Sequence, residues 1–201
     1  MTVQVRSEIV TDAHLPGWLR PPPEGFTAED LDHFPDLPAH TELIDGSLVF
    51  VSPQKDFHSV IVDLLVTALR RCAPERYRVR REMSIILGPR QRPEPDIAVI
   101  HADALTGPDT TAYQAADAVL LVEVVSPDSE TRDRERKPEL YATAGIKHFW
   151  RVEQDKGRPT VYVYEIDPAT KKYVPTGIFH DKLRLTVPFK IDIDLTEADR
   201  L

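Results

Sequence analysis

The sequence predicts an α/β (α+β) chain in which short strands alternate with two helices. Residues 119–125 form a dense run of aliphatic and β-branched side chains, which is typical of a strand buried on both faces. Residues 57–71 place apolar side chains at a spacing of three and four, the period of an amphipathic helix. Residues 77–87 alternate apolar and polar side chains, the period of a half-exposed strand.

The chain begins with a segment rich in proline and acidic residues, over 1–38, which we interpret as an arm, followed by a single domain over 39–201. The first expected element of that domain is a tight hairpin over residues 42–51. An Asp45-Gly46 pair between apolar flanks is its signal, because both residues accept the positive φ angles of such turns. The helix over 57–71 follows, and Pro74 ends it.

The strand expected over 77–87 closes at Gly88-Pro89, and two buried strands follow at residues 97–100 and 119–125. A second helix is expected from near Pro138 to Gly145, with an irregular turn before it, because proline suits a first helical turn and glycine follows a last one. Later strands are expected at residues 148–153, 160–166 and 172–179, the last at a sheet edge that tolerates Pro175. The tail over 183–195 alternates weakly.

Two carboxylates interrupt this apolar pattern. Glu123 lies inside the buried run, where a lone carboxylate would lose its hydration unless a cation replaced the water. Asp96 stands at the start of the preceding buried strand. Two acids on neighbouring buried strands indicate a divalent metal, Mg²⁺ or Mn²⁺.

The composition indicates the size of the core, the role of cysteine and the location of the protein. With 201 residues, of which 41% are hydrophobic and 29% charged, the chain can bury one sizeable core. A single cysteine, Cys72, excludes an internal disulfide and a multi-cysteine zinc site. Because no signal peptide and no membrane-length apolar stretch is visible, we expect a cytoplasmic protein with no membrane partner.

The net charge of −8 argues against a nucleic-acid partner only if it is uniform, and it is not. Residues 70–92 hold eight arginines against two glutamates, a local charge of +6. Such a cluster can meet phosphates or can simply lie on a solvated sheet face, and charge alone leaves both readings open.

The order of elements, with an aspartate on the second strand and a glutamate on the third, resembles the PD-(D/E)xK nuclease core. The chain is also similar to the Uma family of bacterial putative restriction endonucleases. The matching residues are Glu42 to Gly46, His58, Pro95-Asp96, Val122 to Pro127, Asp133, Lys137, Tyr141-Ala142, Gly145 and Phe149-Trp150. The resemblance implies a restriction-endonuclease-like core: a mixed central sheet flanked by helices, with an extra N-terminal hairpin and C-terminal strands. It also implies a Mg²⁺-type site and a nuclease activity.

One position departs from the broad nuclease pattern, because Val125 stands where a lysine is expected two residues after Glu123. Lys137 matches the lysine of the Uma-type motif, so the resemblance carries the catalytic role to it, with Asp96 and Glu123 as catalytic metal ligands. Glu42 matches the family's glutamate and would complete the metal's ligand set, although an exposed strand-edge acid is the alternative. A lysine near the scissile phosphate would orient water and offset developing charge.

Three further residues are accessory candidates. His58 opens a helix, where a histidine more often packs or faces solvent than binds a ligand. Tyr141 lies one turn after Lys137 and either braces the site or packs in the core. Asp133 either orients Lys137 or is one more solvated charge.

The sequence therefore predicts a divalent-metal-dependent endonuclease that hydrolyses DNA phosphodiester bonds, with nucleic acid as its partner. The alternative is a nuclease-fold module that has lost efficient catalysis and binds nucleic acid or a protein. Nucleases of this general fold often act as homodimers, because cutting both strands needs two sites. The motifs of acyl transfer, nucleotide hydrolysis, hydride transfer and zinc proteolysis are missing.

Overall fold

The computed structural model describes residues 17–201, and the first 16 residues of the expected proline-rich arm lie outside that range. Two α-helices and twelve strands make up the regular structure of the described residues. The helices are α1 (Asp56–Cys72) and α2 (Lys137–Thr143). The strands are β1 (Glu42–Ile44), β2 (Ser47–Val49), β3 (Tyr77–Arg81), β4 (Ser84–Ile86), β5 (Ile97–His101), β6 (Ala112–Gln114), β7 (Ala118–Val124), β8 (His148–Asp155), β9 (Arg158–Ile166), β10 (Tyr173–Phe179), β11 (Lys182–Leu185) and β12 (Ile191–Asp194).

Short helical turns connect these elements. Single 3-10 turns span Gly17–Leu19, Asp30–Asp32, Ala102–Ala104, Ala115–Asp117 and Leu195–Arg200. A π-helical turn, Arg132–Arg136, runs directly into α2. This turn is the irregular segment expected before the second helix.

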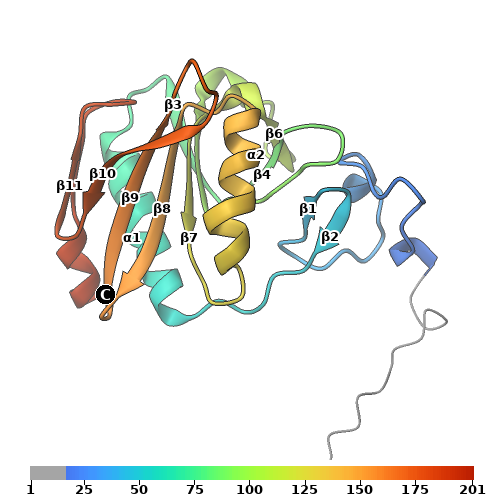
Figure 1. Ribbon diagram of the computed structural model, residues 1–201, viewed down its shortest axis with the longest axis horizontal. Coiled ribbons are helices and arrows are strands. Elements are labelled where there is room, and N and C mark those ends of the chain that lie inside the picture. The colour runs from blue at the N-terminus through green and yellow to red at the C-terminus, as the bar shows by residue number, and fades with distance from the viewer. Residues whose placement is uncertain (1–16) are drawn as a thin grey trace, which may run out of the picture.

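The central sheet is mixed, as the sequence predicted, with strand order β10-β9-β8-β7-β5-β3. The pair β7 and β8 is parallel and every other neighbouring pair in this sheet is antiparallel. Parallel neighbours need a long crossover, and the segment from the π-helical turn through α2 supplies it. The crossover carries α2 across the face of the sheet that Figure 1 shows in front.

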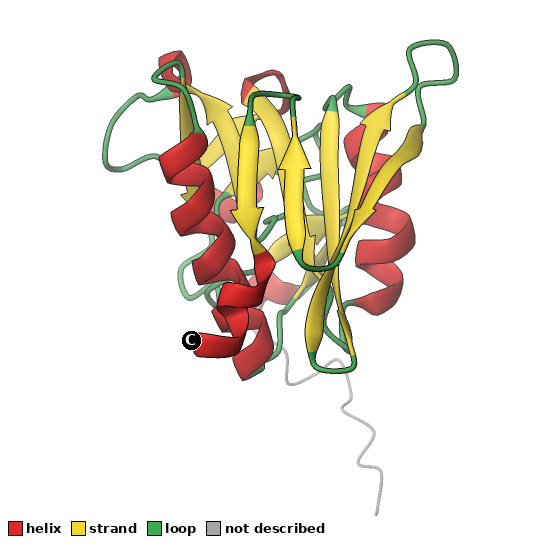
Figure 2. Cartoon of the chain, turned by 90° about the vertical axis from the view of Figure 1, so that its left-hand side faces the viewer, coloured by secondary structure: helices red, strands yellow, loops and turns green. Residues whose placement is uncertain are grey.

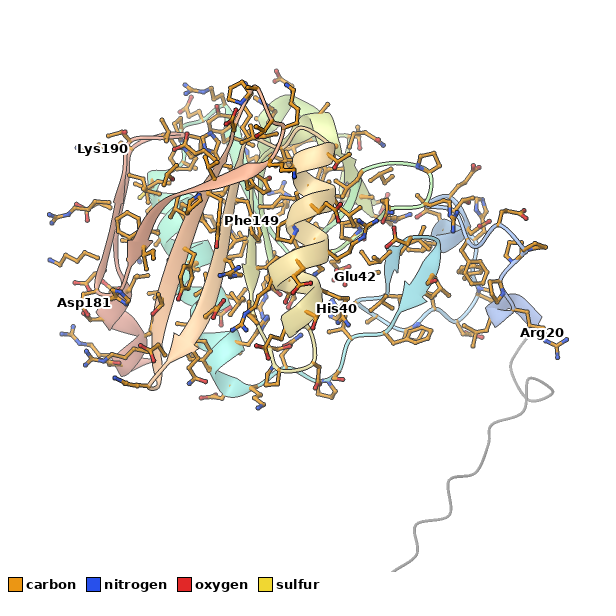
Figure 3. The ribbon with its side chains drawn as sticks, in the orientation of Figure 1. Arg20, His40, Glu42, Phe149, Asp181 and Lys190 are labelled. Carbon is orange, nitrogen blue, oxygen red and sulfur yellow. The ribbon has the colours of Figure 1, made fainter. Side chains whose placement is uncertain are left out.

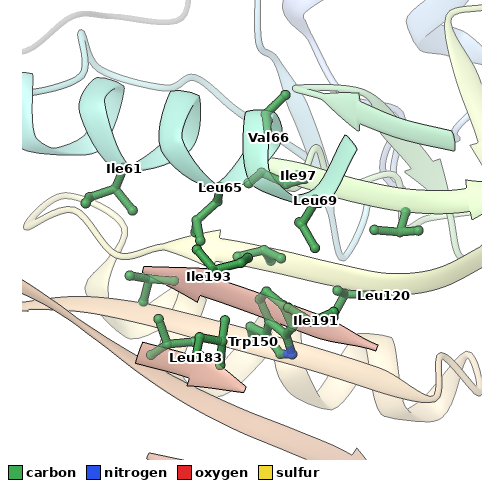
Figure 4. Close-up of a cluster of buried hydrophobic side chains, with 14 of the residues drawn as sticks. Ile61, Leu65, Val66, Leu69, Ile97, Leu120, Trp150, Leu183, Ile191 and Ile193 are labelled. Carbon is green, nitrogen blue, oxygen red and sulfur yellow. The ribbon is translucent and has the colours of Figure 1, made fainter. Parts of the chain in front are cut away.

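Helices cover both faces of the sheet (Figure 2). On one face α1 contributes Ile61, Leu65 and Leu69 to a core that includes the inward side chains of β5, β7 and β8. The hairpin of β11 and β12 closes the same core with Leu183, Ile191 and Ile193, as Figure 4 shows. The weak alternation of residues 183–195 thus marks a real hairpin.

The opposite face packs against α2. Its core contains Ala98 and Ile100 of β5, Leu121 of β7, and Tyr141 and Phe149. Because side chains alternate along a strand, Glu123 points to the same face as Leu121. The site described below therefore lies on the α2 face.

The single strand expected over residues 77–87 is wrong in one respect, because the structure breaks it into β3 and β4. Glu82 lies between them with φ of 50°, a left-handed conformation that ends the sheet register. Its backbone N–H donates to the Asp96 carbonyl at 3.0 Å, while β4 leaves the main sheet and pairs in parallel with β6. Apolar and polar residues continue to alternate through the break at Glu82, so the sequence pattern alone could not reveal the break.

The N-terminal hairpin is confirmed as β1 and β2, with positive φ at Asp45 (55°) and Gly46 (77°). Residues 17–38 lie beside it (Figure 1), and Phe26, Ala28 and Leu31 are buried against Leu43. The boundary between arm and domain stays a prediction. None of the helices within residues 17–201 is long and apolar enough to cross a membrane.

Candidate active site

Asp96 and Glu123 are neighbours across two adjacent strands. In the antiparallel pair of β5 and β7, Ile97 faces Val122, so one further step places Asp96 opposite Glu123. Residues that face each other across an antiparallel pair project to the same side of the sheet. The sheet therefore brings together the two acids that the sequence singled out.

Lys137, the first residue of α2, contacts Glu123 of this pair. Its Nζ lies 2.8 Å from Glu42 Oε1, 3.0 Å from Glu123 Oε2 and 3.3 Å from Asp133 Oδ1. All four side chains are almost fully buried, with 1–6% of their surface exposed. Figure 3 shows Glu42 beside α2, where the N-terminal hairpin approaches the helix. One ammonium group thus bridges three carboxylates from β1, β7 and the π-helical turn.

The π-helical turn explains how Asp133 joins the group. Asp133 and Lys137 are four residues apart and lie on one side of the helical path, with Tyr141 four residues further on. Ser129 also donates its hydroxyl to Asp133 Oδ2. Asp133 is consequently a fixed, buried partner of Lys137, and the alternative of a solvated charge does not apply.

Tyr141 both packs and contacts the site. Its ring is fully buried beside Phe149, and its hydroxyl donates to Glu123 Oε1 at 2.5 Å. Glu123 is therefore held by Lys137 through one oxygen and by Tyr141 through the other. The sequence left bracing of the site and packing as alternatives for Tyr141, because a helical register shows which residues share a face but not which atom a hydroxyl contacts.

His58 and the backbone of β7 fix Asp96. His58 is the third residue of α1, is buried, and has its Nε2 2.9 Å from Asp96 Oδ1. The Val124 N–H donates to Asp96 Oδ2 at 2.6 Å. His58 Nδ1 is buried without a hydrogen-bond partner among residues 17–201. The structure thus places His58 in direct contact with an expected catalytic acid.

The electrostatics follow from this crowding. Burial raises the pKa of the Glu123 carboxyl well above its usual range; Lys137 opposes the rise, and the carboxylates of Asp133, Asp96 and Glu42 add to it. Burial likewise raises the pKa of Asp133. Burial alone would lower the pKa of Lys137, but attraction to Glu123, Glu42 and Asp133 outweighs it, and the pKa is raised. The cluster thus sets one ammonium group against the three carboxyl groups of Glu42, Glu123 and Asp133.

These residues line a pocket of about 330 Å³ that opens to the surface. Within the described chain, its wall carries six carboxylates against two fixed cations, Lys137 and Arg132. The carboxylates belong to Glu42, Glu82, Glu94, Asp96, Glu123 and Asp133. His40 lies at the rim and contacts Glu94 at 2.6 Å.

Among the ionisable residues that line the pocket, sequence reasoning missed four: His40, Glu82, Glu94 and Arg132. Glu94 stands two residues before Asp96, so strand alternation could have suggested it. Glu82 depends on the strand break and Arg132 on the π-helical turn, neither of which a sequence period predicts, and His40 is placed by its long-range contact with Glu94.

The donor set suits a hard divalent ion, although no complete metal site is preformed. Among residues 17–201, no group of three or more His, Cys, Asp or Glu side chains is arranged to hold a metal ion. Mg²⁺, however, is commonly bound through only one or two carboxylates and retains several waters. Asp96 and Glu123 can supply those two carboxylates, whereas Asp133 Oδ1 lies 3.3 Å from the Lys137 ammonium. Glu42 instead contacts Lys137 and accepts from the Glu94 N–H at 2.8 Å.

The comparisons with known proteins define first a class and then a family. A crystal structure described as a putative nuclease belonging to DUF820, from Anabaena variabilis ATCC 29413, superimposes with a TM-score of 0.63 at 18% identity. The match covers 88% of this chain and 93% of that one, so the two share a nuclease-like fold. Residues 28–196 match the family Uma2, described as putative restriction endonuclease, and the chain belongs to that family. No curated protein matches the chain.

Proposed function

We propose that the protein is a divalent-metal-dependent endonuclease that hydrolyses phosphodiester bonds in DNA, with Asp96, Glu123 and Lys137 as its catalytic residues. The observation that carries the proposal is the pairing of Asp96 with Glu123 across adjacent strands, beside the buried ammonium of Lys137. Membership of a family described as putative restriction endonuclease supports the same class of reaction.

The charge of the pocket supports a requirement for divalent metal. A phosphodiester is an anion, and a wall with six carboxylates and two fixed cations in the described chain would repel it. Mg²⁺ or Mn²⁺ held by Asp96 and Glu123 would reverse the local field, polarise the phosphoryl oxygen and lower the pKa of bound water. The metal is therefore expected to be part of substrate binding as well as of catalysis.

The chain's own residues have separate tasks in this proposal. Lys137 places a fixed positive charge beside the reacting phosphate, where negative charge develops as water adds and the P–O bond breaks. Glu42 and Asp133 hold that ammonium in place, while Tyr141 holds Glu123 and His58 holds Asp96. Glu42 thus has a positioning role here, in place of the metal-ligand role that the sequence suggested.

The second candidate is a module that binds nucleic acid or a protein without cutting. Two observations favour it: Val125 occupies the usual lysine position of the strand, and Lys137 is already bound by three carboxylates. A buried ion-pair network of this kind can be purely structural.

A cleavage assay separates the two candidates. Single-stranded DNA, duplex DNA and RNA are incubated with the protein in Mg²⁺, in Mn²⁺ and in EDTA, in parallel with Asp96→Asn. We expect metal-dependent cleavage of DNA by the wild-type protein and loss of nearly all of it in Asp96→Asn. Asp167→Asn, a change of the same chemistry in the loop between β9 and β10, should retain it. A wild-type protein that cleaves nothing would favour the binding module. An Asp96→Asn variant as active as the wild type would show that Asp96 does not hold the catalytic metal.

A further inference from the structure

A second, smaller pocket adjoins the acidic one. Its volume is about 160 Å³, and it lies between the segment 50–55, which leads into α1, and the segment 126–129, which follows β7. Both pockets share Ser52, Pro53, Gln54, Ser129 and Arg132 on their walls. The two pockets are therefore direct neighbours, and one substrate strand could contact both.

The charge changes sign between the two pockets. In the described chain, the charged residues of the smaller pocket are Lys55, Arg132 and Asp128, two cations against one carboxylate. Lys55 is exposed and Arg132 is half-buried. Within residues 17–201 neither side chain forms an ion pair, although most arginines near the site do.

Arg132 is the more informative of the two cations. Its Nε is buried, yet it has no hydrogen-bond partner among the described residues. No carboxylate of the described chain forms an ion pair with this guanidinium, so its charge favours an anion from outside the chain. A guanidinium presents its donors as a planar fork, which matches two oxygens of a phosphate. Arg132 directly precedes Asp133 in the π-helical turn. Because Asp133 is fixed by its contact with Lys137, Arg132 is held at the boundary of the two pockets.

We infer that Arg132 and Lys55 form a subsite for a second phosphate of the substrate strand, adjacent to the phosphate that is hydrolysed. This inference rests on the proposed function and extends it by naming the backbone contact that positions the strand. The acidic pocket needs metal to accept a phosphate, whereas the smaller pocket supplies its own positive charge. The subsite contacts the sugar-phosphate backbone and carries no base specificity.

The test measures strand binding separately from cleavage. The probe is a fluorescein-labelled single-stranded DNA of about 12 nucleotides, and its anisotropy is followed with Ca²⁺ in place of Mg²⁺, between about 50 and 200 mM salt. The wild-type protein is compared with Arg132→Gln, Lys55→Gln and the double variant. The matched control is the double variant Arg200→Gln/Lys190→Gln, which removes the same charge from exposed residues that line neither pocket.

We expect each substitution at the subsite to weaken binding by about tenfold, the usual consequence of losing one charged hydrogen bond. The slope of log affinity against log salt should fall by about 1 for each phosphate contact removed. Arg132→Lys, which keeps the charge but loses the fork, should retain the slope with weaker binding. Unchanged melting temperatures would show that the variants fold.

The outcomes distinguish this inference from the proposed function. If the wild-type protein cleaves DNA while the double variant binds like the control, the subsite is wrong and the nuclease stands. If binding depends on Arg132 and Lys55 but no cleavage occurs, the subsite stands and the proposed catalysis fails. If the wild-type protein does not bind the probe, the subsite is overturned, and the cleavage assay alone decides the proposed function.

Discussion

Lys137 is the central residue of the site. Its ammonium balances the negative charges of Glu42, Glu123 and Asp133 at distances of 2.8, 3.0 and 3.3 Å. A buried charge that loses its partner is costly, whereas a buried pair replaced as a whole can be nearly neutral. The lysine therefore has a structural task in addition to the proposed catalytic one. A simple loss of activity in a Lys137 variant would not separate the two.

Unfolding experiments can separate them. In the absence of divalent metal, Lys137→Met should lower the free energy of unfolding by about 3–5 kcal/mol, because it leaves buried carboxylates without their cation. The double variant Lys137→Met/Glu123→Gln should recover part of that loss, since one of the stranded charges is gone. Urea unfolding of both variants, with Lys190→Met as an exposed control, measures the difference.

The opposite result would be informative. If Lys137→Met is as stable as the wild-type protein, or if the double variant is less stable than the single one, the ammonium does not compensate the carboxylates. The contacts around Lys137 would then contribute no net stability.

Among the elements, the crossover from β7 to β8 positions most of the site. Glu123 stands near the end of β7, Asp133 lies in the π-helical turn, and Lys137 and Tyr141 belong to α2. The sequence located this crossover because Pro138 and Gly145 mark the helix and the apolar run marks the strand. It could not reveal the π-helical turn, because inserting one extra residue into a charged helical segment leaves no hydrophobic period to read.

The hairpin of β1 and β2 is a second contributing element. Its Asp45-Gly46 turn was readable from sequence, but the burial of Glu42 was not, because burial depends on contacts with distant Lys137 and Glu94. Buried Arg92 holds the segment before β1 in place, because its guanidinium donates to the Ala28 carbonyl and to Asp32. Part of the arginine-rich stretch is therefore structural and does not face phosphates.

The contact between Arg92 and Asp32 predicts a pH-dependent contribution to stability. The hydrogen bond from Arg92 holds the pKa of the Asp32 carboxyl below its usual value. A carboxyl with a lowered folded-state pKa stabilises the fold above its unfolded pKa of about 3.9, and that stability is lost as pH falls through the folded pKa. Asp32→Asn should therefore lower the melting temperature at neutral pH, and the difference from wild type should shrink as pH falls toward 3.

The effect should be small, because Asp32 is 44% exposed and an exposed ion pair is worth less than about 1 kcal/mol. Asp36→Asn, an exposed acid of the same segment, is the matched control. Equal melting temperatures for Asp32→Asn and Asp36→Asn at every pH would show that the Arg92 contact does not stabilise the segment.

At the scale of the whole molecule, acidic and basic side chains from distant parts of the sequence gather in two neighbouring pockets. The chain carries a net charge of −8, and the acidic pocket concentrates six carboxylates of the described chain around one opening. The neighbouring pocket is the cationic exception. Net charge alone would have argued against a nucleic-acid partner, whereas the structure separates an acidic pocket, where we propose a divalent cation, from a cationic pocket, where we propose a phosphate of the strand.

The central claim is that Asp96 and Glu123 together hold a divalent ion beside Lys137. The most direct measurement is the anomalous scattering of Mn²⁺ in crystals of the wild-type protein soaked at millimolar concentration. We predict one peak within ligand distance of an oxygen of Asp96 and an oxygen of Glu123, about 2.0–2.6 Å away, and no peak at this position in Asp96→Asn. A wild-type crystal without a peak between these two carboxylates, or with the ion bound elsewhere, would contradict the account.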